Sequence, residues 1–277
     1  MEETIYPYGW HLIAFLDICG QREELRQLQM PKTEKEYLVV QETLKNTAGV
    51  VLSLRKLFRD YFESFTQGYP NLIAPEFRGV SDSLIVSVPL KDNDANVTLV
   101  RCYCALSSAA TLMISSLASR HALRGGIELG VGIEISQGEI YGSASERAYL
   151  LESHEAVYPR ILIGDELCTY LSLGQLDAEK AAGAGGQILR ELIRKMKELI
   201  TKDADNRNIL DYLGPGIVSV STPNQADILV KRAYHFVLEQ HQYWISAGNT
   251  KLGERYANLR QYFESRLPLW GLSAAKS

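Results

Sequence analysis

The sequence predicts an α+β protein in which one β-sheet is layered with helices and a helical appendage closes the chain. Two observations predict this class. Apolar runs of strand length are interspersed with helical patterns up to about residue 165, and two of the strands are spaced as a hairpin. From residue 187 onward the pattern is almost entirely helical. We therefore expect a sheet-containing domain over residues 1–182 and a mainly helical extension over residues 183–277.

The composition is that of a soluble globular protein. The chain has 277 residues, of which 46% are apolar and 22% charged, and its net charge of −4 offers no broad basic surface, so no nucleic-acid partner is expected. The longest apolar-leaning stretch, Cys102 to Leu117, is shorter than the ~20 residues that cross a bilayer, so no membrane partner is expected. The N-terminus carries no signal sequence and the four cysteines have no metal-finger spacing, which indicates a cytoplasmic protein.

The chain opens on a strand that ends in a carboxylate. The apolar run His11 to Leu16 leads to Asp17, and Gly20 then precedes a polar helix start at Gln21. Asp17 is expected at the tip of the strand, facing the amides of a helix N-terminus. Such a corner can hold a cation on the carboxylate and a phosphate on the N–H groups. The alternative is that Asp17 merely caps the helix.

A second corner follows a long helix. The apolar spacing predicts a helix over residues 35–65, and glycine and proline residues mark a loop after it. In the stretch Phe77 to Pro89, Asp82 precedes an apolar strand. Residues 97–121 are expected to form a buried helix, whose small residues favour close packing on a sheet.

The middle of the chain predicts a β-hairpin. Residues Arg124 to Ser136 alternate, and the pattern continues over Glu139 to Gly142 after a turn. Repeated glycines in the first strand indicate that something approaches the backbone closely. The remaining predicted elements are a helix over 143–154, a strand over 160–165, a helix over 187–202, a short strand around 209–213, and helices over 225–246 and 251–266.

Together, Asp17 and Asp82 suggest a metal site. Both lie at the edges of predicted strands that can be neighbours, with glycines nearby that would admit a ligand. Carboxylate oxygens select hard cations such as Mg²⁺ or Mn²⁺, which usually also hold substrate phosphates. Two such ions per site could activate an attacking oxygen and neutralise a leaving pyrophosphate.

Four motifs, in order, resemble those of class III nucleotidyl cyclases. Phe15 to Gly20 resembles their first metal motif, and Arg78 to Asp82 the second, in which a base-reading residue stands four positions before the aspartate. Arg124 to Gly130 resembles their Arg-x-Gly-Ile-x-x-Gly strand, and Glu139 to Gly142 lies where they have an Asp-hydrophobic-aromatic-Gly run. The resemblance covers about residues 12–165. It implies a ferredoxin-like cyclase sheet, with residues 1–182 as the catalytic domain.

The resemblance also implies roles for individual residues. The metal ligands for two Mn²⁺ or Mg²⁺ ions would be Asp17, Asp82 and the backbone carbonyl of Ile18. The phosphates would be received by the amides of Cys19, Gly20 and Gln21. The base would be read by Arg78, Glu139 and Tyr141.

The chain departs from the family at the catalytic helix. The family's transition-state asparagine and arginine fall here on Glu146 and Leu150, so neither is present. Two nearby arginines, Arg147 and Arg160, are the candidates to replace them as catalytic residues. The alternative for each is an ordinary surface charge.

The base-reading positions, and the runs at residues 148–152 and 158–161, look more like the pyrimidine cyclases of bacterial Pycsar anti-phage systems. Those proteins make cyclic UMP or cyclic CMP, which activates a separate effector. The resemblance therefore predicts a homodimeric uridylate cyclase that converts UTP to 3′,5′-cyclic UMP and pyrophosphate in anti-phage defence. The alternatives are a cytidylate cyclase acting on CTP, an adenylate or guanylate cyclase, and a cyclase-like module that binds a nucleotide without chemistry.

Overall fold

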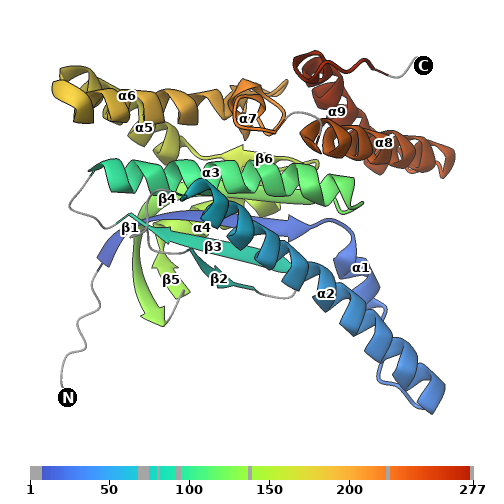
Figure 1. Cartoon of the computed structure of the whole chain (residues 1–277). Coiled ribbons are helices and arrows are strands. Elements are labelled where there is room, and N and C mark those ends of the chain that lie inside the picture. Colours follow the sequence, from blue (N-terminus) through green and yellow to red (C-terminus); the bar gives the residue numbers. More distant parts are fainter. Residues whose placement is uncertain are drawn as a thin grey trace, which may run out of the picture.

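The computed structural model describes residues 8–67, 75–79, 82–90, 95–136, 139–222 and 225–274, and these form one β-sheet layered with helices (Figure 1). The described strands are β1 (Tyr8–Ile18), β2 (Glu76–Arg78), β3 (Ser83–Pro89), β4 (Leu123–Ser136), β5 (Glu139–Gly142), β6 (Ile161–Ile163), β7 (Ile200–Lys202) and β8 (Asn208–Leu210). The described helices are α1 (Gln21–Arg26), α2 (Glu34–Phe65), α3 (Ala95–Ala118), α4 (Ser143–Leu150), α5 (Asp165–Lys180), α6 (Gly183–Glu198), α7 (Pro215–Val218), α8 (Gln225–Ser246) and α9 (Thr250–Arg266). A π-helical turn, η1 (Leu151–Glu155), follows α4, and a 3₁₀ turn, η2 (Leu267–Trp270), follows α9.

The eight described strands make one mixed sheet in the order β2-β3-β1-β4-β6-β8-β7, with β5 paired to β4. Among these pairs β4 and β6 run parallel and the others are antiparallel. The predicted α+β class, with a sheet layered by helices, is confirmed. The predicted hairpin over residues 124–142 is present as β4 and β5.

Alternation along β1 separates the two faces of the sheet. Leu12, Ala14 and Leu16 join the large core formed with α2 and α3, whereas Ile13 packs in a smaller cluster with α4. Phe15 lies at the edge of that smaller cluster. Residues 11, 13, 15 and 17 share one face, so Asp17 points to the side that α4 covers.

The glycines of β4 make room for α4 and η1. A Cβ added at Gly126 would lie 2.5 Å from the Ala148 carbonyl oxygen and 2.5 Å from the Leu151 side chain. One added at Gly130 would lie 2.8 Å from the Ala144 nitrogen. The sequence correctly predicted a close approach to this backbone. At these two glycines the approaching group is the chain's own helix rather than a ligand.

The sheet continues past the predicted domain boundary at residue 182. β7 and β8 pair with each other, and β8 pairs with β6. Residues 200–202, predicted as the end of a helix, are strand β7, and α5 occupies a segment for which no helix was predicted. The part of the chain beyond the sheet begins at α7. There α8 packs against α3, and α9 packs against α8 (Figure 1).

Among the described residues, one helix segment, Val97–Ala118 of α3, is long and apolar enough to cross a membrane. Of its most apolar window, 83% is buried inside the protein, where it packs between the sheet and the helices α2, α6 and α8. This is the environment of a core helix.

Candidate functional site

The two aspartates meet at one end of the sheet. Asp17 is directly opposite Ser83 in the β1–β3 register, and Asp82 is the residue immediately before Ser83. The Ser83 hydroxyl donates to Asp17 Oδ1 at 3.0 Å, so the residue next to Asp82 holds the first carboxylate in place. Asp17 and Asp82 are only 4% and 2% exposed. The structure thus brings together the two carboxylates that the sequence predicted as a pair.

Sequence reasoning did not assign a role to Arg124, which also reaches this corner. It is opposite Asp17 in the β1–β4 register, and its Nη2 lies 3.7 Å from Asp17 Oδ2. The guanidinium donates from Nε and Nη2 to Glu152 Oε1, at 2.8 and 2.5 Å. Arg124 was part of the Arg-x-Gly-Ile-x-x-Gly motif, so its sequence signal was present.

The donor set at this corner fits hard divalent cations. It provides two carboxylates on adjacent chain segments, with main-chain carbonyls at the strand ends, and such oxygens suit Mg²⁺ and Mn²⁺. Within the described residues no group of three or more His, Cys, Asp or Glu side chains forms a metal cage.

The predicted phosphate-binding amides lie in the turn after β1. The Cys19 amide donates to the Ala122 carbonyl at 2.9 Å and is therefore engaged within the fold. Gly20 has a φ of +99°, a conformation that glycine adopts readily, and it turns the chain into the short α1. Gln21 is buried, and its side-chain nitrogen Nε2 donates to the Thr47 carbonyl of α2 at 3.5 Å. Phosphate binding here stays a prediction for the amides of Gly20 and Gln21.

The structure brings two of the predicted base-reading residues together. Arg78 Nη1 lies 3.2 Å from Glu139 Oε2, and the Ser136 hydroxyl bridges them at 2.6 Å on each side. Because β3 and β1 separate β2 from β4 in the sheet, the β4–β5 hairpin must curl across to make this contact. Tyr141, the third predicted residue, is 72% exposed on β5.

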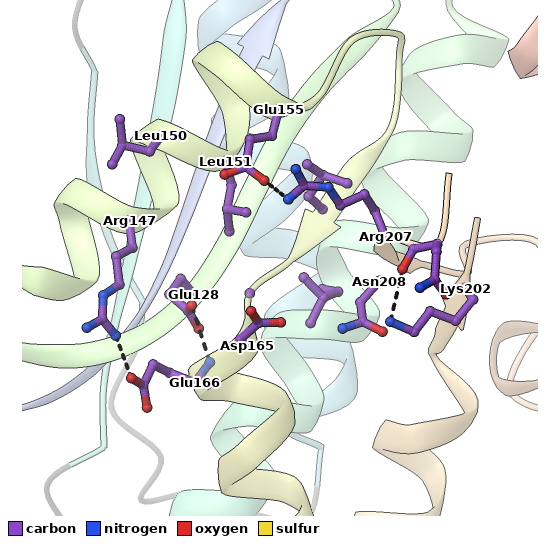
Figure 2. Close-up of a pocket in the computed structure, with 14 residues that line it drawn as sticks. Glu128, Arg147, Leu150, Leu151, Glu155, Asp165, Glu166, Lys202, Arg207 and Asn208 are labelled. Atoms are coloured by element: carbon purple, nitrogen blue, oxygen red, sulfur yellow. Dashed lines mark hydrogen bonds and ion pairs between the residues drawn. The ribbon is translucent and has the colours of Figure 1, made fainter. Parts of the chain in front are cut away.

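Arg147 lies over a charged pocket. A cavity of about 530 Å³ is bounded by α4, η1, the start of α5 and the β7–β8 hairpin, and Figure 2 shows its lining side chains. Arg147, Lys202 and Arg207 supply the positive charges of this pocket. Arg147 donates to Glu166 at 2.8 Å, and Arg207 pairs with Glu155. Glu128, Glu155, Asp165 and Glu166 line the same cavity, so its lining carries charges of both signs.

Glu128 is the buried carboxylate at this pocket. It accepts from the backbone amides of Leu129 and Leu167, at 2.8 and 2.9 Å, and so caps the N-terminus of α5. Burial raises the pKa of the Glu128 carboxyl, although these amide bonds oppose the rise. A side chain at Gly164 would collide with this carboxylate, so the glycine between β6 and α5 is required for the cap.

Arg160 has a structural environment. It is 2% exposed and pairs with Asp203 and Asp205 on the β7–β8 hairpin, and it also donates to the Glu155 carbonyl at 3.3 Å. Its guanidinium lies 4.7 Å from the centre of the Tyr158 ring. Arg160 is therefore buried, and it is not the surface charge that was the alternative to a catalytic role. Its contacts with Glu155, Asp203 and Asp205 join η1 to the hairpin and lie away from Asp17 and Asp82 in the chain.

No protein-family profile and no curated protein sequence matches the chain. Among solved structures, the chain is similar to the adenylyl cyclase CyaB from P. aeruginosa, with 17% identity and a TM-score of 0.40, covering 61% of this chain and 83% of that one. It is also similar to the guanylyl cyclase domain of the RhoGC fusion protein from Blastocladiella emersonii, with 12% identity and a TM-score of 0.41, covering 73% and 94%. A class III adenylyl cyclase-like ATP-binding protein from Pseudomonas aeruginosa shows 12% identity and a TM-score of 0.35, covering 100% and 76%.

Proposed function

We propose that this protein is a class III nucleotidyl cyclase, and specifically a uridylate cyclase that converts UTP to 3′,5′-cyclic UMP and pyrophosphate. The observation that carries the proposal is the β1–β3 register. It places the aspartates of two cyclase-like motifs, Asp17 and Asp82, at one end of the sheet with Ser83 bonded to the first. They are 65 positions apart in the chain, so sequence alone could only suggest that they lie close together.

The residues of this corner have distinct parts in the reaction. The ribose 3′-oxygen attacks the α-phosphorus, the bond from that phosphorus to the bridging oxygen breaks, and pyrophosphate leaves. Asp17 and Asp82 would hold two Mg²⁺ or Mn²⁺ ions, which supply acidification of the 3′-hydroxyl and neutralisation of the leaving group. Arg124 places a permanent positive charge beside Asp17, where negative charge on a triphosphate can be stabilised. Arg147 stays the candidate for stabilising the transition state from α4.

The Arg78–Glu139 pair supports recognition of a base edge. A guanidinium only donates and a carboxylate only accepts, so together they match an edge with a carbonyl next to an N–H. The O4 and N3–H of uracil form such an edge. The N3 and exocyclic amine of cytosine form the reversed one, so CTP is the alternative substrate. Cyclic UMP would serve, as in the anti-phage systems that the motifs resemble, to activate a separate effector in the cytoplasm.

An exposed apolar row supports the proposed homodimer. Tyr8 and Tyr141 both lie opposite Ile133, in β1 and β5 respectively, so the three side chains share one face of the sheet. The tyrosines are 77% and 72% exposed. Trp10, two residues after Tyr8 and so on the same face of β1, is 52% exposed. We propose that a second copy of this chain covers the row, with its metal corner facing the base-reading hairpin of the first, as the resemblance to class III cyclases implies.

A nucleotide panel tests the proposal. Purified protein is incubated with Mn²⁺ and each of UTP, CTP, ATP and GTP, and pyrophosphate and cyclic product are measured. Cyclic UMP with equimolar pyrophosphate supports the uridylate cyclase, and cyclic CMP supports the cytidylate alternative. Product from ATP or GTP alone would assign a purine cyclase. Nucleotide binding without pyrophosphate release would leave the non-catalytic module.

A further inference from the structure

The π-helical turn η1 carries a buried carboxylate at the proposed metal corner. Glu152 is 0% exposed, and it approaches the sheet because Gly126 has no side chain: a Cβ there would be 3.1 Å from the Glu152 nitrogen. π-Helical turns are rare and occur often at functional sites, because the extra residue shifts the direction of the side chains that follow. Here the turn places Glu152 beside Arg124.

Arg124 lies between two carboxylates and is bonded closely to one of them. Its Nη2 is 2.5 Å from Glu152 Oε1 and 3.7 Å from Asp17 Oδ2. The first distance is that of a charge-assisted hydrogen bond and the second is too long for one. Glu152 therefore holds the guanidinium away from direct hydrogen bonding with Asp17.

We infer that Glu152 is a positioning residue, which keeps Arg124 out of hydrogen-bond contact with Asp17, so that the guanidinium does not compete with a divalent cation for that carboxylate. This inference rests on the proposed function, because it concerns the same metal corner. A cation at Asp17 competes with any guanidinium bonded there. Without the Glu152 charge, Arg124 is attracted to Asp17, whose Oδ2 lies only 3.7 Å from its Nη2.

The substitution Glu152→Gln keeps the size of the side chain and removes its charge. Mn²⁺ alone is titrated into the full chain, and bound metal is measured by electron paramagnetic resonance. We expect the dissociation constant for Mn²⁺ to rise roughly tenfold, because unit charges about 4 Å apart interact strongly near a protein surface. The matched control is Glu155→Gln, in the same turn: Glu155 pairs with Arg207 rather than Arg124, so its loss leaves Mn²⁺ affinity unchanged.

A double variant separates positioning from structural damage. If Glu152 acts by restraining Arg124, then Arg124→Met combined with Glu152→Gln removes the competing cation and restores Mn²⁺ binding toward the wild-type value. Damage to the fold would weaken binding in the double variant at least as much as in the single one. Thermal unfolding of each variant shows which proteins are folded at the assay temperature.

The outcomes distinguish this inference from the proposed function. Wild-type protein that binds Mn²⁺, with Glu152→Gln binding equally well, overturns the positioning role and leaves the metal site standing. Wild-type protein that binds no Mn²⁺, or binds it unchanged after Asp17→Asn, overturns the metal site itself. Weaker binding in Glu152→Gln with recovery in the double variant supports both.

Discussion

At the residue scale, the glycines of β4 make room for the chain's own helices rather than for the ligand expected from the sequence. The glycines of β4 predict that some group approaches the backbone closely, and the group expected from the sequence is a ligand. Gly126 instead admits Ala148 and Leu151 of the chain's own helical layer. Sequence could show that a side chain is absent. It could not show what fills the space, because the filling residues lie about 20 positions away and pack through a turn type that no local pattern marks.

The packing at Gly126 makes a stability prediction. Gly126→Ala places a methyl group 2.5 Å from a backbone oxygen, and we expect it to lower the free energy of unfolding by about 1–3 kcal/mol. The matched control is Gly49→Ala in α2, where nothing lies within 4 Å and the helix should gain about 0.5–1 kcal/mol. Urea denaturation of the two variants measures both changes. Equal stabilities would contradict the packing described at Gly126.

The buried carboxylate Glu128 predicts a pH dependence. Burial raises its pKa, so the folded state holds the proton more tightly than the unfolded state does. The stability that this contributes is complete below the ordinary glutamate pKa and is lost as the pH rises through the raised value. We expect the wild type to lose stability relative to Glu128→Gln as the pH rises from the ordinary glutamate pKa through the raised one. A pH-independent difference, measured by urea denaturation, would show that the pKa is not raised.

At the element scale, the β7–β8 hairpin was the part least accessible from sequence. Its strands are three residues each, too short for a clear alternation, and residues 200–202 continue the helical pattern of α6. The hairpin's role depends on Arg160, which binds Asp203 and Asp205 across more than 40 residues. Arg160 could be identified from sequence as a candidate catalytic residue, but its carboxylate partners could not be predicted locally.

The burial of Arg160 predicts that its main role is to stabilise the fold rather than to take part in catalysis. Arg160→Met leaves the carboxylate of Asp203, only 12% exposed, with the Tyr158 hydroxyl but without its cationic partner, and we expect a loss of about 3–5 kcal/mol. Arg147→Met removes an exposed pair and should cost no more than about 1 kcal/mol. Chemical denaturation compares the two variants. Wild-type stability in Arg160→Met, together with loss of turnover, would return Arg160 to a catalytic role.

At the scale of the whole molecule, the order of the motifs proved more informative than any single one. The α+β class and the long α2 and α3 helices were predicted from periodicity, and the paired aspartates from two strand ends. The position of β1 between β3 and β4 explains why these ends meet, since Asp17 is opposite both Ser83 and Arg124. Sheet order depends on long-range pairing, which single-strand patterns do not encode.

The exposed row on β1, β4 and β5 makes a prediction about assembly. If a second copy covers it, charge substitutions at Trp10 and Tyr141 to glutamate should convert the dimer to monomers and abolish turnover, while each monomer stays folded. Multi-angle light scattering measures the mass at assay concentration. An active monomer, in the wild type or in the variant, would contradict a site shared between two copies.

We propose above all that Asp17 and Asp82 form one catalytic metal site. The most direct test measures pyrophosphate release from UTP with Mn²⁺ by the wild type, Asp17→Asn and Asp82→Asn, with circular dichroism of all three. We predict turnover by the wild type and its loss in both variants, with the fold retained, because each change removes a metal ligand and almost no volume. Near wild-type turnover in either folded variant would contradict the claim.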